Sequence, residues 1–407
     1  MAIQNNNKDI IVTLVEYKNN GNGDYSEAFV DFRTTDDYDE FVSAMGVVKN
    51  NNASVVQFLN LYSRRRLVHG AYYKLNVEIL KGIEPEAIDD NVPLLVGYIF
   101  NFQNKQGNQN DLLLESHAPL APADIIITND GIDALTDFPK EQFKLRVNDV
   151  GQGNCNEIID EDDNVKLVYD MGGSLHANRQ AVQKLLDKRL PFYKKSHPVL
   201  FISHWDFDHI VQLKLLSDAD IKDFAGLICP AKMTSMTSQN IYKRFLSILS
   251  KNKVLSLAPP RKVQRKGHSR MLFYKKTNVY SIYHGETNRN LNYCGIVLMV
   301  YGKAGNVLLT GDCSYLQAST VLSQEVGNIA NCPNQIMVAP HHGGKFSRNL
   351  GTLTIPPHGY KPMSALVSVD ANDNTYGHPD SDVLSDLSKI YKEVKRTDKN
   401  GTIERAL

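Results

Sequence analysis

From about residue 142 to its end, the chain alternates short apolar runs, many ending in Asp, His or Gly, with stretches of helical spacing. In layered α/β folds, loops leave the sheet at the carboxyl ends of the strands, and reactive side chains gather there. This region therefore predicts a layered α/β domain with a functional site at a sheet edge. Strands are predicted at KLRVNDV, NEIID, VKLVYD, PVLFISH, GLICPA, GIVLMVY, NVLLTGD, QIMVAPHH and SALVSVD, and helices at ANRQAVQKLLDKRL, NIYKRFLSILSKN, YLQASTVLSQEV and SDVLSDLSKIY.

Residues 1–115 have a different texture and predict a separate, smaller α+β domain, which agrees with a length of 407 residues, enough for two or three domains. Residues 116–141, which carry three prolines, predict a linker, and 142–407 form the second domain. Strands are expected at DIIVTLVEY, EAFVDFR, YYKLNVEIL and VPLLVGYIFNF, helices at DDYDEFVSAMGVV, with Asp37 as N-cap, and at SVVQFLNLYSRRR, and a polar loop at NKQGNQND.

Composition excludes several classes of protein. Lys plus Arg equals Asp plus Glu, at 45 each, so bulk charge indicates neither nucleic-acid nor membrane binding. No apolar run approaches the roughly 18 residues of a membrane span, and the amino terminus lacks the features of a signal peptide. The five cysteines are scattered without a CxxC pair, which argues against a disulfide framework or a zinc ribbon. A cytoplasmic protein without membrane partners is expected.

The strongest local signal is SHWDFDHI, directly after the predicted strand PVLFIS. It places His204, Asp206, Asp208 and His209 within six residues. A turn that follows a strand lets closely spaced side chains converge, and two imidazoles with two carboxylates can serve two adjacent cations. A polar turn with an N-cap aspartate is the simpler alternative.

Three later segments end in residues that could join this motif. NVLLTGD stops at Asp312, whose two oxygens could each serve one cation. QIMVAPHHGG carries His341 and His342. Because side chains alternate along a strand, we expect one of these histidines to face the metals. The other is expected either to support a metal ligand without binding the metal itself or to act on substrate. NTYGHP places His378 in a turn. Taken singly, "GD" and a turn histidine usually have no special role.

The order DVGQG, LVYDMGG, SHWDFDHI, NLNYCGIVLMV with LLTGD, APHHGG, YGHP and RTDKNGTI resembles the metallo-β-lactamase domain of ComEC-type competence proteins and their soluble relatives. The resemblance covers about residues 142–407 and implies an αββα sandwich with metals at one edge of its two sheets. It implies a metal region of His204, Asp206, Asp208, His209, Asp312 and a histidine of the 341–342 pair. Asp170 corresponds to the superfamily's structural aspartate, and His378 is a ligand or catalytic candidate.

The chain departs from the family pattern at three places. Asn154 follows DVGQG where Asp is usual, and Val211-Gln212 replace the usual glycines, which would narrow the pocket or shift its substrate. The separate histidine that many superfamily members carry before the GD motif has no clear match, and neither His268 nor His284 is favoured. One metal position is therefore expected to have fewer ligands. The membrane channel of the competence proteins has no counterpart, so DNA import is not implied.

Two divalent metal ions, Mn²⁺ or Zn²⁺, are the expected cofactors. They could share a hydroxide that attacks phosphorus, with Asp208 as ligand and orienter and His342 or His378 as proton donor to the leaving oxygen. Because the carboxylate of Asp206 stands where an imidazole is common, Mn²⁺ is expected to support activity at least as well as Zn²⁺.

Other features allow two interpretations each. Tyr62 to Arg66, with His69, Tyr72 and Tyr73, could track a phosphate backbone or form a solvated helix end. Trp205 could stack on a base or pack in the core, and Cys313 is expected to be packed and not a ligand. A second basic zone, which could contact substrate phosphates or form a solvated loop, contains Arg261, Lys262, Arg265, Lys266, Lys275 and Lys276.

Three functions fit this sequence. The first is a metal-dependent phosphodiesterase or nuclease, which would need a basic groove leading to the metals. The second is a hydrolase of a small phosphoester or cyclic nucleotide, which would need a closed pocket and agrees better with the neutral net charge. The third is a non-catalytic interaction module on the same fold, with residues 1–115 recruiting a partner protein or a second copy. The six core metal candidates argue against this last function.

Overall fold

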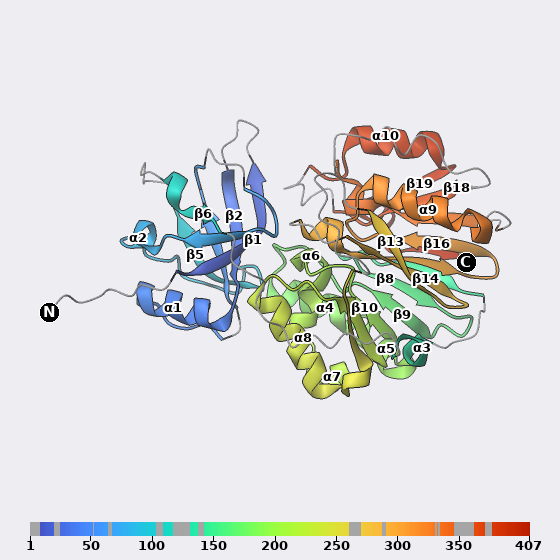
Figure 1. Cartoon of the computed structure of the whole chain (residues 1–407), viewed down its shortest axis with the longest axis horizontal. Helices are drawn as coiled ribbons and strands as arrows, with labels where there is room; N and C mark the ends of the chain where they lie inside the picture. The colour runs from blue at the N-terminus through green and yellow to red at the C-terminus, as the bar shows by residue number, and fades with distance from the viewer. Residues whose placement is uncertain are drawn as a thin grey trace. The chain divides into compact units, whose positions relative to one another are not determined.

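The computed structural model divides into two compact units. One comprises residues 1–123 with 233–242, and the other comprises 124–232 with 243–407. Each unit is described by itself (Figure 1). No helix among the described residues is long and apolar enough to cross a membrane. The described residues are 9–19, 25–51, 53–63, 67–102, 109–116, 131–136, 142–259, 270–286, 290–329, 332, 334–345, 362–370 and 377–407.

The first unit is built on a six-stranded sheet with the strand order β5-β3-β2-β1-β4-β6. Its apolar face packs against α1, where Tyr38 and Phe41 are buried. Its elements are β1 (Ile11–Asn19), β2 (Tyr25–Phe32), α1 (Thr35–Met45), β3 (Val55–Leu59), β4 (Tyr72–Leu75), α2 (Val77–Leu80), β5 (Val96–Asn101) and β6 (Leu113–Glu115).

Three expectations for this unit are wrong in detail. A helix is expected at 54–66, but the described part, 54–63, contains the strand β3. Val55, Val56 and Phe58 are buried in this strand, which pairs with β2 and β5, and this burial outweighs the helical spacing. The predicted strand at 72–80 ends at Leu75 and continues as the short helix α2. The N-cap of α1 is Thr34, whose side chain accepts a hydrogen bond from the backbone N–H of Asp37.

A segment far along the chain belongs to this first unit. Residues 233–242 contain the first turns of α8 (Met236–Ile248), and the buried carboxylate of Asp31 accepts a hydrogen bond from the backbone N–H of Thr237 at 2.9 Å. The other oxygen of Asp31 accepts from the Ser54 hydroxyl at 3.0 Å. A buried carboxylate stabilises the positive end of a helix, so this aspartate fixes the start of α8.

The second unit contains two seven-stranded sheets. The first has the order β12-β11-β10-β9-β8-β7-β20, and β9 to β12 run parallel. Its strands are β7 (Lys144–Val147), β8 (Asn156–Ile159), β9 (Val165–Tyr169), β10 (Val199–Phe201), β11 (Gly226–Pro230), β12 (Val254–Leu257) and β20 (Ile403–Ala406).

The second of these sheets has the order β13-β14-β15-β16-β17-β18-β19. The predicted hairpin of β15 and β16 is confirmed, and β16 to β19 run parallel. Its strands are β13 (Met271–Lys276), β14 (Tyr280–Gly285), β15 (Ile296–Tyr301), β16 (Gly305–Leu309), β17 (Asn334–Val338), β18 (Pro362–Val367) and β19 (Glu393–Arg396).

Side chains from both sheets form one apolar core, as in two stacked sheets whose inner faces interdigitate. On the outer face of the second sheet, α9 (Tyr315–Ile329) and α10 (Ser381–Ile390) cover a further apolar cluster. Figure 1 shows these two helices on one side of the sheets and α4 (Arg179–Asp187) and α5 (Leu190–Ser196) on the other. The predicted layered α/β architecture is thus confirmed as helix, sheet, sheet, helix. Within the predicted linker, α3 (Gly131–Thr136) contributes the buried Ile132 to this core.

A buried carboxylate on the inner face of α9 provides a test of this packing. Glu325 is 1 % exposed and accepts hydrogen bonds from the hydroxyls of Tyr283 and Tyr301 and from the amide of Asn328. Burial opposes its ionisation, but these hydrogen bonds outweigh burial and lower its pKa below the ordinary value of 4.5. A lowered pKa means that the carboxylate stabilises the fold above pH 4.5, and that this contribution is lost as the pH falls through the lowered value.

We therefore expect Glu325→Gln to reduce the free energy of unfolding by about 1–3 kcal/mol at pH 7. The difference from the unmodified chain should shrink as the pH falls below the pKa of the folded carboxyl. Urea denaturation at a series of pH values measures both quantities. A difference that stays constant with pH would show that the ionised form contributes nothing.

Candidate metal centre

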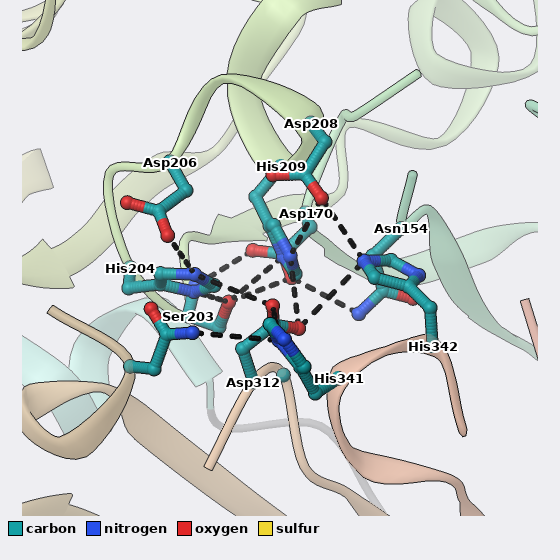
Figure 2. A network of polar contacts seen from close by, with 12 residues as sticks. Asn154, Asp170, Ser203, His204, Asp206, Asp208, His209, Asp312, His341 and His342 are labelled. Carbon is teal, nitrogen blue, oxygen red and sulfur yellow. Dashed lines mark hydrogen bonds and ion pairs between the residues drawn. The ribbon is translucent and has the colours of Figure 1, made fainter. Parts of the chain in front are cut away.

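The site lies where the carboxyl ends of strands from both sheets meet. Asp170 follows β9, and the segment Ser203–His209 follows β10. From the other sheet, Asp312 follows β16, and the turn Pro340–Gly343 follows β17. Because parallel strands end at the same sheet edge, residues more than 100 positions apart converge (Figure 2).

Four of the predicted metal residues form one compact cluster. Asp208, His209, Asp312 and His342 each offer a ligand atom, and these atoms all lie within 4.8 Å of one another. Asp312 Oδ1 lies 3.1 Å from His209 Nε2 and 3.7 Å from His342 Nε2. His342 Nε2 also lies 3.1 Å from Asp208 Oδ2. Two imidazoles and two carboxylates at this spacing match the ligand set of a divalent transition metal.

Three of the four ligand atoms of this cluster are buried without hydrogen-bond partners, namely His209 Nε2, His342 Nε2 and Asp312 Oδ1. His204 Nε2, outside the four-residue cluster, is a further atom of this kind. Leaving buried polar atoms unsatisfied is costly, and a bound cation would satisfy all of them at once. The residues present therefore fit a metal.

Asp170 accepts the hydrogen bonds that position His209 and the start of the metal motif. Its carboxylate accepts from the backbone N–H and the hydroxyl of Ser203 at 2.7 and 2.8 Å, and its Oδ2 lies 2.8 Å from His209 Nδ1. The amide of Asn154 donates to the same Oδ2 at 3.2 Å. With Nδ1–H bound to Asp170, His209 presents Nε2 as its lone-pair atom. Neither Ser203 nor Asn154 was singled out as functional from the sequence, although both lie in its motifs.

The two oxygens of Asp312 divide the site into two halves. Oδ1 faces His209 and His342, whereas Oδ2 lies 2.5 Å from His341 Nδ1 and 4.0 Å from His204 Nε2. His204 Nε2 in turn lies 3.0 Å from Asp206 Oδ2. Figure 2 shows Asp206 and His204 on one side of Asp312 and Asp208 and His342 on the other. All seven predicted metal residues thus meet around one carboxylate.

The 341–342 pair is arranged differently from expectation. Both histidines lie in a turn beyond β17 and not on the strand, and both have left-handed backbone angles, with φ of 49° and 53°. The alternation rule for strands therefore does not apply, and both rings reach Asp312, one at each oxygen. The second nitrogen of His342, Nδ1, lies 2.8 Å from the carbonyl oxygen of Ser368.

The charges of the site stabilise ionised carboxylates. Burial opposes the ionisation of Asp208, but His209 and His342 outweigh it and lower its pKa to about 2. Burial also opposes the ionisation of Asp312, and three neighbouring imidazoles hold its pKa well below the ordinary range. Metal ligands must be deprotonated, so both carboxylates have the required form at neutral pH.

His378 lies at the margin of the cluster. Its ring centre is 4.8 Å from that of His341. Burial, and next the neighbouring His341 and His342, lower its pKa to about 3, so that the ring is neutral at pH 7. This state favours a base or a hydrogen-bonding group over a proton donor.

A single methyl group can test the importance of this ring. A Cβ added at Gly344 would lie 2.1 Å from His378 Cε1, so Gly344→Ala must displace the ring. If His378 acts on substrate, we expect Gly344→Ala and His378→Ala to lower kcat/KM by a similar factor, about 10- to 100-fold, because small misplacements are costly in catalysis. Cation content, measured by elemental analysis, should not change.

The matched control is Gly327→Ala, since a Cβ at this helical glycine would meet nothing within 4 Å. Full activity of Gly344→Ala would exclude His378 from the reaction.

Several other expectations are corrected or answered by the structure. Val211 and Gln212 are buried away from the ligand atoms. Gln212 donates to the carbonyl of Gly172 and Val211 packs near Gly173, so both side chains fill interior space next to the motif. Trp205 is 2 % exposed and donates to the carbonyl of Pro230, as in the core alternative.

The remaining candidates lie elsewhere. His284 is buried between the carbonyls of Leu257 and Gly285, and Cys313 is packed in the apolar cluster under α9 and α10. Tyr72 and Tyr73 are buried in β4 and cannot serve as stacking platforms. Lys275 and Lys276 belong to β13, and Lys276 donates to Asn328. Arg64, Arg65, Arg66, Arg261, Lys262, Arg265, Lys266 and His268 lie outside the described residues.

Comparisons with known proteins add only remote similarities. No family model and no curated protein matches the chain. A metal-dependent hydrolase of the β-lactamase superfamily is 12 % identical, with a TM-score of 0.37, and the match covers 65 % of this chain and 99 % of that one. Zn²⁺-bound PqqB from Methylobacterium extorquens is 9 % identical (TM-score 0.32, 62 % and 86 % covered). A long form of RNase Z from yeast is 9 % identical (TM-score 0.31, 81 % and 51 % covered). These scores are too low to assign a family, and the site rests on its own geometry.

Proposed function

We propose that this protein is a metal-dependent hydrolase with a metallo-β-lactamase fold. The observation that carries the proposal is the cluster of Asp208, His209, Asp312 and His342, whose ligand atoms come from three separate segments and lie within 4.8 Å of one another. Three of these atoms are buried without hydrogen-bond partners. A purely structural polar cluster would have satisfied its own atoms.

The architecture supports the same proposal. Two stacked sheets with helices outside, and a ligand cluster at one edge of both, match what the motif order implies. The motifs that carry the resemblance also supply the cluster, since SHWDFDHI contains Asp208 and His209, LLTGD ends at Asp312 and APHHGG contains His342. A non-catalytic module would have no reason to keep this ligand set intact.

The reaction that fits best is hydrolysis of a phosphodiester, and a nucleic acid is the first substrate class. Divalent cations bound here would supply Lewis acidity and lower the pKa of water towards neutrality. The carboxylate of Asp208 accepts hydrogen bonds and can orient a nucleophile, and the neutral ring of His378 can donate a hydrogen bond to a leaving oxygen while keeping its proton. The neutral net charge favours a small phosphoester or cyclic nucleotide as the second candidate.

Incubation with Mn²⁺ and a substrate panel tests the proposal. The panel contains single- and double-stranded DNA, RNA, cyclic nucleotides and bis-p-nitrophenyl phosphate, with His204→Ala and Asp208→Ala as matched variants. We expect turnover of at least one phosphodiester, and its loss in both variants. A chain that binds cations but hydrolyses nothing on the panel would contradict the hydrolase assignment to phosphodiesters.

A further inference from the structure

We propose that Asn292 is a metal ligand, and that its side-chain carbonyl completes a second, weaker cation position around Asp312 Oδ2. This inference rests on the proposed function only in requiring that the cluster binds divalent cations. No motif argument singles out this residue, which lies within NLNYCG and carries no charge.

Asn292 is a buried polar residue whose hydrogen bonds are incomplete. It is 4 % exposed, and its Oδ1 has no hydrogen-bond partner. Its Nδ2 lies 3.4 Å from His341 Nδ1, the same nitrogen that lies 2.5 Å from Asp312 Oδ2. A single ring nitrogen cannot both donate to a carboxylate and accept from an amide. A flip of the amide by 180° exchanges its oxygen and nitrogen, and a cation shared by the carboxylate, the imidazole and the amide oxygen would then remove this conflict.

The turn that carries Asn292 is held against the metal motif. Asn292 lies in a 3₁₀ turn, Leu291–Cys294, and its backbone N–H donates to the side chain of Asn290 at 3.0 Å. The next strand begins with Ile296, whose N–H donates to the carbonyl of Ser203 at 2.8 Å. A Cβ on Gly295 would lie 3.0 Å from that carbonyl and 3.7 Å from His204 Cβ. The turn that carries Asn292 is therefore held close to the segment Ser203–His204, while its side chain contacts His341.

The donors of this second half differ from those of the four-residue cluster. The Oδ1 half has two imidazoles and the carboxylate of Asp208, whereas the Oδ2 half has His204, His341, the carboxylate of Asp206 and the neutral amide. The amide carbonyl is a hard ligand that suits Mn²⁺ or Mg²⁺.

A nearby lysine weakens this half further. This lysine is Lys232. Its Nζ lies 3.9 Å from Cys294 Sγ, in the same turn as Asn292. An ammonium group beside this turn opposes the binding of a cation to the Oδ2 half. The Oδ2 position is therefore the exchangeable one, and the Oδ1 position keeps its ion.

Mn²⁺ titration of the full chain, stripped with a chelator, tests the inference. Free Mn²⁺ is followed by electron paramagnetic resonance, and bound Mn²⁺ by elemental analysis after desalting. We expect the unmodified chain to bind two ions with Kd values at least about 10-fold apart. Asn292→Ala should weaken the second ion by about 10- to 100-fold and leave the first unchanged.

Two further variants separate ligation from folding. Asn292→Asp keeps the shape and an oxygen and adds charge, so it should bind the second ion at least as tightly as the unmodified chain. Asn306 is equally buried at 4 % exposure but lies in β16, and Asn306→Ala should leave both Kd values unchanged. Thermal unfolding of each metal-free variant shows whether it is folded.

The outcomes are distinguishable. Unchanged Kd values in Asn292→Ala, or weakening of the first ion only, would overturn the role of Asn292. A single ion bound by the unmodified chain would overturn the second position and leave the proposed function standing. No bound ion at all would remove the proposed function itself.

Discussion

Asp312→Asn is expected to lower kcat/KM by about 10³-fold or more and to reduce bound cation below one per chain. Among the residues that the structure describes, Asp312 is the carboxylate that contacts both halves of the site, through His209 and His342 at Oδ1 and through His341 and His204 at Oδ2. The amide keeps the shape but loses the negative charge and one acceptor oxygen. Phosphodiester turnover and elemental analysis on the same sample measure both effects.

Asp160→Asn is the matched control for this substitution. Asp160 is buried to the same extent, 4 % exposed, and follows β8, which runs antiparallel to β9 and so ends at the opposite sheet edge. We expect its turnover to stay within about 2-fold of the unmodified chain. If Asp312→Asn kept both its cations and its turnover, the cluster would be a structural network without catalytic use.

Asp170→Ala is expected to reduce the free energy of unfolding by about 3–5 kcal/mol, even in the metal-free protein. The substitution leaves the backbone N–H of Ser203, its hydroxyl, His209 Nδ1 and the amide of Asn154 without their shared acceptor in a fully buried place. Each unsatisfied buried donor is costly. Without this acceptor, His209 also loses the contact that orients its Nε2, so cation affinity should fall as well.

The chain provides its own probe for this measurement. Trp205 is its only tryptophan and is buried in the second unit beside the site, so its fluorescence reports unfolding of that unit alone. Urea denaturation followed at this residue gives the free energy directly. Asp170→Asn, which keeps one acceptor oxygen, should be less damaging than Asp170→Ala. A loss below about 1 kcal/mol for Asp170→Ala would show that the surrounding donors find other partners.

Local pattern was sufficient for the parts of the site that are close in sequence. The turn after PVLFIS predicts His204, Asp206, Asp208 and His209 as neighbours, because a strand that ends in a turn brings such side chains together whatever the rest of the fold does. The layered α/β architecture also followed from apolar runs that alternate with helical spacing. The meeting of Asp312 and His342 with this turn needed the family resemblance, since no local rule joins distant strands.

Where burial competes with local spacing, the sequence was misleading. Residues 54–66 have helical spacing but contain β3, because two neighbouring strands bury Val55, Val56 and Phe58 on both sides. Val211 and Gln212 follow the motif directly, and the structure buries both, one near Gly173 and the other at the carbonyl of Gly172. The direction in which a side chain points relative to a distant segment cannot be inferred from the local sequence.

The amino-acid order by itself determined which residue types stand at the ends of the strands, and hence that a cation-binding chemistry was available to this protein. Only the tertiary structure decided which of these residues lie at each oxygen of Asp312 and which of them support the ligands. It placed His341 and His342 at opposite oxygens of Asp312, gave Asp170 the task of orienting His209, and brought Asn292 beside His341. The physical reason is that a ligand set depends on the directions of lone pairs, and those directions are set by backbone turns and by packing between sheets that are remote in the chain.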